Sequence, residues 1–251
     1  MVFLSSIEPV YFFLPLIGFI VGLLGTMMGG GGGFIFLPTL TLIVGVPAQI
    51  AVITSLVATL PICLVGAISH YNRENIHIRM ALLFSATGLV GALSGVAIAG
   101  ILSSAQLKTI FGIYSILMAL IIVFDIRRKN NVFHRIKAPF FGLFAGVATG
   151  ALGISASAPI LAGLLSLRFS VKMAIGTSIF IVLSNTLFAA GAHFVVGQID
   201  LTLVLFLTAG SAIGAIIGPR LLDGVKNNHT ESFKYIYAAV MTILGTLMII
   251  R

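Results

Sequence analysis

Residues 27–38 read MMGGGGGFIFLP, with five consecutive glycines from Gly29 to Gly33 and a proline at Pro38. Five glycines in a row break a helix, because glycine loses more backbone entropy on becoming helical than any other residue. The flanking stretches, LIGFIVGLLGT at 16–26 and TLTLIVG at 39–45, are apolar enough for the core of a lipid bilayer. The sequence therefore places irregular backbone where no water is present to bond it.

The composition indicates an integral membrane protein. The chain has 251 residues, of which 59% are hydrophobic and only 8% are charged, and its mean hydropathy is +1.19. Long apolar stretches with so few charges are typical of transmembrane helices and exclude a soluble domain. Residues 1–10 contain no Lys or Arg, so we expect the first hydrophobic segment to remain rather than to be cleaved as a signal peptide. The single Cys63 excludes an intrachain disulfide and is expected to be a small buried side chain.

Apolar runs separated by polar breaks predict ten segments in an all-α polytopic membrane protein. Most are close to the roughly 20 residues that cross a bilayer. The second and the seventh are much shorter, which is typical of half-membrane or re-entrant segments. The expected spans are 10–28, 33–46, 48–69, 79–101, 105–126, 138–153, 156–167, 172–196, 201–222 and 232–250.

The two short segments occupy matching places because the chain repeats itself. Residues 48–56, AQIAVITSL, match residues 171–179, VKMAIGTSI, at an offset of 123 residues. The same offset relates His70 to His193. A constant offset shared by separate features indicates an internal duplication of about five segments. The predicted organisation is a first transmembrane repeat at 1–126, a basic linker at 127–137 and a second transmembrane repeat at 138–251.

The basic residues predict that the two repeats are inverted in the membrane. The linker, within IRRKNNVFHRIK at 126–137, is the obvious cytoplasmic loop. If each repeat crosses the membrane an odd number of times, twelve of the 14 Lys and Arg residues lie on the linker's side, whereas an even number leaves eight there. Positive charge concentrates on the cytoplasmic side of bacterial inner membrane proteins, so the odd count is favoured. The orientation of the chain in the membrane then explains the net charge of +8, and nucleic-acid binding is not needed to explain it.

The glycine run is predicted to line a binding site for a small anion. Irregular backbone is tolerated at membrane depth where it lines a cavity, and short, glycine-interrupted segments in inverted repeats indicate a transporter's substrate site. The matching stretch of the second repeat reads GISASAP at 153–159. Backbone N–H groups there can hold an anion without a buried Lys or Arg. The predicted substrate-binding residues are Gly30, Gly31, Gly32, Gly33, Thr54, Ser55, Ser155, Ser157, Thr177, Ser178 and Asn185.

Several polar and small residues have purely structural alternatives. Hydroxyls in helices can bond their own helix carbonyls, which is the alternative for Thr54, Ser55, Thr177 and Ser178. The Asn185 amide can form a hydrogen bond between helices. Small residues let helices approach closely, and this packing role is expected for the scattered glycines Gly18, Gly22, Gly91, Gly95, Gly214 and Gly218.

The remaining polar groups are expected at the membrane surfaces. Because the repeats are inverted, His70 and His193 are expected at opposite faces of the membrane, where they cap helices or gate a pathway. Glu74 and Asp200 are expected in solvated loops.

Five stretches carry a resemblance to a known family: GLLGTMMGGGGGFIFLPTL at 22–40, AVITSL at 51–56, SHYNRENI at 69–76, AIGTSI at 174–179 and HFVVGQID at 193–200. With these motifs the chain resembles the TauE/SafE sulfite exporter family of bacterial membrane transporters, over nearly its whole length. The second repeat departs from the family pattern, with Ser155, Ala156 and Ser157 where the family often has a second run of three glycines. The resemblance implies transport of sulfite, sulfonates or related sulfur-containing anions across the inner membrane.

From the residues alone, the prediction is a secondary transporter of a small anion, without cofactor or metal. The chain lacks the GxxxxGK[ST] motif of nucleotide-driven pumps, the HExxH motif and a Cys pair, so an enzyme is not expected. The alternative is an anion channel, or a transporter of a different small carboxylate or inorganic anion. Coupling to a proton or sodium gradient, passive flux and a homodimer in the lipid bilayer all stay open.

Overall fold

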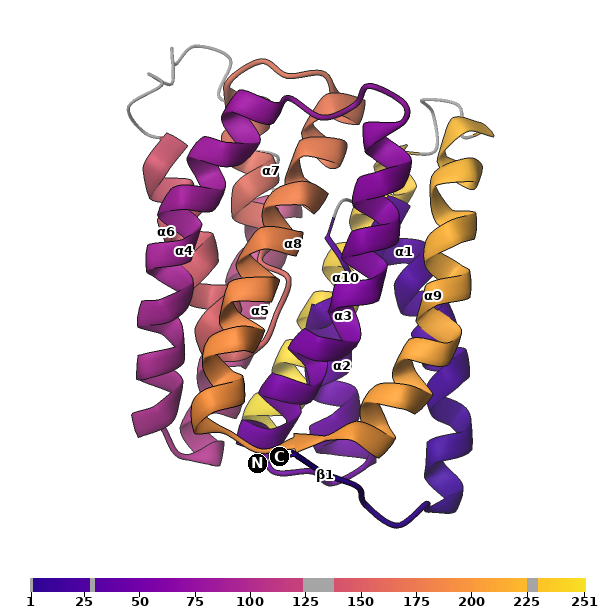
Figure 1. Ribbon diagram of the computed structural model, residues 1–251, viewed down its shortest axis with the longest axis vertical. Helices are drawn as coiled ribbons and strands as arrows, with labels where there is room; N and C mark the ends of the chain where they lie inside the picture. The colour runs from indigo at the N-terminus through magenta and orange to yellow at the C-terminus, as the bar shows by residue number, and fades with distance from the viewer. Residues whose placement is uncertain (1, 28–29, 124–137, 225–229) are drawn as a thin grey trace.

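Six helices are long and apolar enough to cross a membrane in the computed structural model, which describes residues 2–27, 30–123, 138–224 and 230–251 (Figure 1). These long helices are α1 Leu14–Met27 with the preceding 3-10 turn Pro9–Phe13, α3 Ala48–Tyr71, α4 Ile78–Ile101, α5 Ser104–Val123, α8 Val171–Val196 and α9 Leu201–Gly224. The other helices are α2 Gly33–Pro38, the π-helical turn η2 Thr39–Ile43 that continues it, α6 Ala138–Leu152, α7 Ser157–Ser166 and α10 Thr230–Ile250. The chain is therefore a multi-pass helical membrane protein, as predicted.

The short helices belong to two hairpins that enter the bundle from opposite ends. In Figure 1, α1 rises from the lower end, where both termini lie, and α2 returns toward that end to meet the start of α3. The other hairpin descends from the upper end along α6 and returns upward along α7 to the start of α8. Neither α2 nor α7 is long enough to span a bilayer. Each hairpin therefore turns inside the protein.

The helices pair in a pattern that stays the same when the helices of the first predicted repeat are exchanged for those of the second. Helix α1 packs against α9 and, at the matching place, α6 packs against α4. Helices α3 and α8 pack on each other, as do α5 and α10. In Figure 1 the matching helices α3 and α8 run in opposite directions.

Glycines make the closest of these crossings possible, as predicted for the scattered glycines. A β-carbon on Gly91 of α4 would overlap the carbonyl oxygen of Leu143 in α6. A β-carbon on Gly214 of α9 would overlap the carbonyl oxygen of Phe19 in α1, which precedes Leu143 by 124 residues. The two crossings therefore use matching glycines against matching carbonyls, with backbones closer than any side chain allows.

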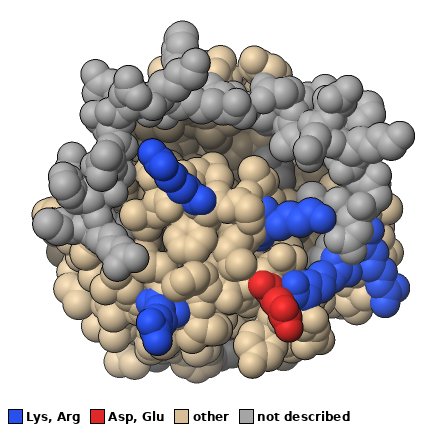
Figure 2. Space-filling view, turned by 90° about the horizontal axis from the view of Figure 1, so that it is seen from above, with Lys and Arg blue, Asp and Glu red and all other residues tan. Residues whose placement is uncertain are grey.

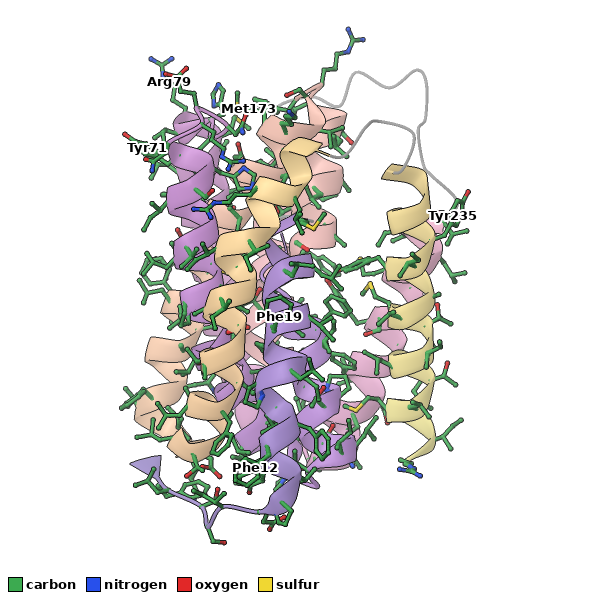
Figure 3. The ribbon with its side chains drawn as sticks, turned by 90° about the vertical axis from the view of Figure 1, so that its right-hand side faces the viewer. Phe12, Phe19, Tyr71, Arg79, Met173 and Tyr235 are labelled. Atoms are coloured by element: carbon green, nitrogen blue, oxygen red, sulfur yellow. The ribbon has the colours of Figure 1, made fainter. Side chains whose placement is uncertain are left out.

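The outward faces of the helices are as apolar as their inward faces. Leu16, Ile113, Leu187 and Leu205 are all more than half exposed. Helices that are apolar all round are typical of membrane spans, since lipid covers the outer face. Figure 3 shows this surface between Tyr71 and Arg79 at the upper end and Phe12 at the lower end.

Basic side chains gather at the upper end. Seen from above, Figure 2 shows Lys and Arg side chains spread over this face, some of them next to an acidic side chain. The upper end carries the helix ends and connections that contain Arg73, Arg79, Arg168, Lys172, Arg220 and Glu74. Lys108, near the start of α5, and Arg251, at the carboxyl terminus, lie at the lower end. The linker at 127–137 lies outside the described residues.

The lower end also corrects one expectation. Val2–Phe3 pairs in parallel with Ile199–Asp200, a short strand pair beside an otherwise helical set of described residues, as expected for the all-α class. Asp200 is 3% exposed rather than solvated. Its Oδ1 accepts hydrogen bonds from the N–H groups of Thr202 (3.0 Å) and Leu203 (3.4 Å) at the start of α9. Asp200 is buried because it caps this helix beneath the amino-terminal strand.

The helix crossings predict that alanine lowers the stability of the protein at Gly91 but not at Gly191. Gly91→Ala is expected to destabilise the protein by about 1–3 kcal/mol, because the new methyl group overlaps α6 and forces the helices apart. The matched control is Gly191→Ala in α8, where an added β-carbon meets nothing within 4 Å. There alanine should leave stability unchanged or raise it by up to about 1 kcal/mol. Thermal unfolding of the purified proteins in detergent measures both, and equal melting temperatures for the two variants would contradict this account of the crossing.

Candidate functional site

The tips of the two hairpins meet inside the bundle. The backbone N–H of Gly33, at the start of α2, donates a hydrogen bond of 3.0 Å to Oγ of Ser155, in the turn between α6 and α7. Both residues are buried, and 122 residues separate them along the chain. Two of the residues selected from sequence, one from each repeat, thus contact each other directly.

The glycine run turns the chain through a left-handed conformation. Gly31 and Gly32 have φ angles of 59° and 74°, which residues with a β-carbon adopt only with strain. The N–H groups of Gly30 and Gly31 both donate to the carbonyl oxygen of Gly25, at 2.8 and 3.2 Å. These bonds pair the first described peptide groups beyond α1, which are buried. Met28 and Gly29 lie outside the described residues.

The four described glycines of the run face different partners. The α-carbon of Gly32 faces Val21 of α1, so this glycine is a turn and packing position. Gly33 faces polar atoms instead, since a β-carbon there would lie 2.8 Å from Ser155 Oγ and 3.1 Å from Thr59 Oγ1. Gly30 faces Ser157 in the same way, since a β-carbon on Gly30 would lie 2.6 Å from Ser157 Oγ.

Helix α3 forms one wall of the meeting point with residues that were not selected from the sequence. Thr59 lies against Gly31 and Gly33, and its hydroxyl donates to the carbonyl oxygen of Ser55 at 2.7 Å. Cys63, one helical turn further on, also lies against Gly31. The only signal for Thr59 was its place one turn beyond the paired hydroxyls of Thr54 and Ser55.

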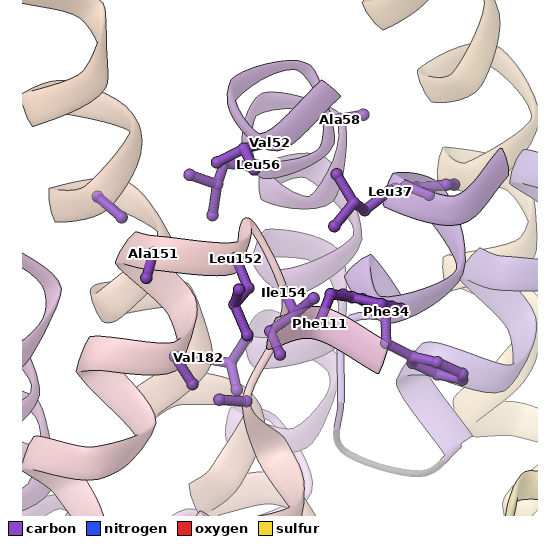
Figure 4. Close-up of a cluster of buried hydrophobic side chains, with 14 of the residues drawn as sticks. Phe34, Leu37, Val52, Leu56, Ala58, Phe111, Ala151, Leu152, Ile154 and Val182 are labelled. Atoms are coloured by element: carbon purple, nitrogen blue, oxygen red, sulfur yellow. The ribbon is translucent and has the colours of Figure 1, made fainter. Parts of the chain in front are cut away.

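The second tip packs against α3 through Gly153, another glycine with a positive φ angle. Gly153 has φ 64°, and a β-carbon there would lie within 3 Å of the backbone of Val52. Figure 4 shows the adjoining apolar side chains, with Leu152 at the end of α6 and Ile154 of the turn near Leu56 of α3. This packing positions Ser155 for its bond to the first hairpin.

The paired hydroxyls from the two repeats have unlike environments, although all four are buried. Thr177 accepts a hydrogen bond of 3.0 Å from the N–H of His77, in the connection between α3 and α4. Its repeat counterpart Thr54, and the adjacent Ser55, make no side-chain hydrogen bond within the described part of the chain. Thr54 and Ser55 thus do not bond their own helix carbonyls. A cavity shared by the hydroxyls of both repeats stays a prediction.

Asn185 and His193 are buried on the side of α8 that faces α4 and α6. The Asn185 amide lies against Gly88 of α4, and neither of its atoms has a hydrogen-bond partner among the described residues. The imidazole Nε2 of His193 lies 2.8 Å from the carbonyl oxygen of Gly150 in α6. His193 is therefore a helix–helix contact rather than an interfacial cap. His70 is also buried, near the end of α3.

The described residues named above around the two tips are uncharged. The N–H groups of Gly30, Gly31 and Gly33 already donate to protein oxygens, so the Ser155 and Ser157 hydroxyls are neutral groups that can turn toward a small anion and hold it by hydrogen bonds. Among the described residues, no three His, Cys, Asp or Glu side chains lie close enough to hold a metal ion.

A groove elsewhere in the bundle has the wrong chemistry for an anion. It has a volume of about 340 Å³ and lies between α5, α6 and α7. Its walls include Leu117, Phe140, Phe144 and Pro159, all with apolar side chains. An anion entering this groove would lose its hydration without gaining hydrogen bonds. The tips are therefore the better candidate site.

Comparison with known proteins identifies the family. The family described as "Sulfite exporter TauE/SafE" matches residues 14–248. The chain belongs to this family. It is 26% identical over 238 residues to "Probable membrane transporter protein YdhB" of Bacillus subtilis, covering 91% of this chain and 96% of that protein. It is 28% identical over 260 residues to "Probable membrane transporter protein MJ0441" of Methanocaldococcus jannaschii, covering 93% and 92%. No solved structure matches this chain.

Membership of the TauE/SafE family makes the chain a membrane transporter, and it confirms the resemblance carried by the glycine run. The matched region includes both hairpins and both sets of paired hydroxyls.

The different hydrogen bonding of the Thr177 and Thr54 hydroxyls generates a prediction about stability. Thr177→Val is expected to cost about 1–3 kcal/mol, because it keeps the side-chain shape but leaves the His77 N–H without its acceptor. Thr54→Val removes no hydrogen bond within the described part of the chain, so it should be neutral or stabilising. Chemical or thermal unfolding of the two variants in the same detergent tests this difference. A larger loss for Thr54→Val than for Thr177→Val would contradict the arrangement.

Proposed function

We propose that this chain is a secondary transporter of a small sulfur-containing anion, such as sulfite, a sulfonate or a related oxyanion, that binds where the two hairpin tips meet. The observation that carries the proposal is the bond between the Gly33 N–H and Ser155 Oγ. It brings helix-breaking backbone from both repeats to one buried place, as expected for a transporter's substrate site. The proposal that the anion contains sulfur rests on the family's description rather than on the geometry of the site.

The chemistry of the site fits an oxyanion with several equivalent oxygens. The Ser155 and Ser157 hydroxyls can each donate one hydrogen bond, and their torsions can turn toward a ligand. Hydrogen bonds from neutral donors to an ionised acceptor are stronger than neutral pairs. A buried Lys or Arg would add attraction but would also hold the anion too firmly for release, so a neutral site suits transport.

We further propose that residues 1–126 and 138–251 form inverted repeats with the basic upper end in the cytoplasm of a bacterial cell. The exchange of helix pairs and the opposite directions of α3 and α8 in Figure 1 support inversion. The Lys and Arg side chains at the upper end support its cytoplasmic orientation. On this orientation the 127–137 linker is cytoplasmic, and both termini face outward.

An anion channel is the second candidate, together with a transporter of a different carboxylate or inorganic anion. The buried bond between the tips favours a transporter, since an open channel needs a continuous polar path. Flux into proteoliposomes separates the two, because a transporter saturates with substrate whereas a channel does not. Flux measured with imposed proton or sodium gradients identifies the coupling ion of a transporter.

The meeting of the tips predicts a loss of binding in Ser155→Ala. The hydroxyl is one donor to the proposed anion, so its removal should weaken binding by about 1.5–3 kcal/mol, or roughly tenfold or more in Kd. Ser94→Ala is the matched control, because Ser94 is exposed on α4 and its hydroxyl donates to its own helix carbonyl at Val90. Calorimetric titration with sulfite, thiosulfate, sulfoacetate, taurine and sulfate measures the effect. Equal affinities in both variants would remove Ser155 from the site.

The proposed orientation predicts opposite labelling of two exposed positions. On a Cys63→Ala background, Asn72→Cys in the α3–α4 connection should react only with a reagent that reaches the cytoplasm. Ser103→Cys, in the α4–α5 connection at the other end, should react with an impermeant maleimide added outside intact cells. Labelling of both positions from the same side would show that the helix between them does not cross the membrane as proposed.

A further inference from the structure

Three polar atoms converge on one face of Gly33, and one of them belongs to α3 rather than to either hairpin. A β-carbon on Gly33 would have as its nearest neighbours Ser155 Oγ at 2.8 Å, the Ser155 backbone nitrogen at 3.0 Å and Thr59 Oγ1 at 3.1 Å. Thr59 is 1% exposed. Its hydroxyl oxygen is therefore held inside the protein, beside the residues through which the two tips meet.

The Ser155 groups on this face have donor capacity that the chain does not use. The Ser155 N–H makes no hydrogen bond in the ranges that the structure describes, although Ser155 is buried. The Ser155 hydroxyl accepts from the Gly33 N–H, which leaves its own hydrogen to donate. A buried N–H without an acceptor is rare in proteins, and the oxygen of a bound ligand can supply the acceptor here.

The Thr59 hydroxyl can change its partner without leaving another group unpaired. It donates to the carbonyl oxygen of Ser55 at 2.7 Å. In an α-helix the same carbonyl accepts from the backbone N–H of Thr59, four residues further on, so it stays paired when the hydroxyl turns away. The methyl group of Thr59 lies against Gly31, and a β-branched side chain is restricted in its rotamer. Only the hydroxyl hydrogen must turn, because the oxygen already faces Gly33.

We propose that Thr59 is a substrate-contacting residue, whose hydroxyl donates to the transported anion together with the N–H and the hydroxyl of Ser155. This inference rests on the proposed function, and it extends the site from the two hairpins to α3. Three neutral donors suit an oxyanion, because its charged oxygens are strong acceptors and no fixed charge is needed to bind them. Gly33 contributes by lacking a β-carbon on the face where these donors converge.

Thr59→Val is the test, because valine keeps the methyl group against Gly31 and removes only the hydroxyl. We expect the Kd for sulfite or thiosulfate, whichever the wild-type protein binds more tightly, to rise by about tenfold. Thr59→Ser retains the hydroxyl and should keep the Kd within about threefold of the wild-type value. The melting temperature of Thr59→Val without ligand should equal that of the wild type, because the Ser55 carbonyl stays paired.

Thr41→Val is the matched control. Thr41 is also buried, and its hydroxyl donates to the carbonyl oxygen of Leu37, four residues earlier, at 2.9 Å. It lies in η2, beyond the carboxyl end of α2, whereas the tip lies at the amino end of α2. This variant removes the same kind of hydroxyl away from the site, so it should bind the anion as the wild type does.

The outcomes separate this inference from the proposed function. If Ser155→Ala weakens binding and Thr59→Val does not, Thr59 is outside the site while the proposed function stands. An equal loss of affinity in Thr59→Val and Thr59→Ser would show that the shape of the side chain matters rather than its hydroxyl, which also overturns the inference. If the wild-type protein binds neither sulfite nor thiosulfate, the proposed function fails for these two anions, and the role of Thr59 in binding them fails with it.

Discussion

A peptide group that leaves a helix inside a membrane has no water to bond, and this constraint governs the arrangement of both hairpins. In the first hairpin, the carbonyl of Gly25 accepts from Gly30 and Gly31, and the N–H of Gly33 is satisfied by Ser155 of the second. Each tip is stable only because protein surrounds it. The irregular backbone therefore lies at the one place where the two repeats can enclose it together.

The long helices make this enclosure possible by packing closely around the hairpins. Helix α1 is held by α9, and α6 by α4, through crossings in which glycine lets backbone contact backbone. Each hairpin has thus one arm fixed to a long helix of the other repeat. The second arm is shorter and ends near the centre, so a movement between the two helix pairs would carry the tips relative to each other.

Much of this fold follows from the sequence because lipid imposes simple demands on it. The ten apolar runs correspond to the helices α1 to α10 of the described residues, and Gly30 to Gly32 are irregular as the composition of the glycine run predicts. The place of Thr59 at the tips could not be predicted, because lipid-facing and core-facing positions of these helices are equally apolar and the helical pattern does not show which residues face inward. The prediction that Asp200 is solvated was wrong for a different reason. Its burial depends on the amino-terminal strand, which is almost 200 residues away in sequence.

The two repeats are most alike in their scaffold and least alike at the candidate site. The capping residues His77 and Asp200 differ in type, yet each holds the first turn of a matching helix. At the tips the difference is chemical, with a glycine turn on one side and the Ser155 and Ser157 hydroxyls on the other. A sulfonate, one of the proposed substrates, also has two unlike ends, three oxygens and one carbon substituent. A site built from identical halves would bind such a molecule equally well in two orientations, whereas unlike tips can select one.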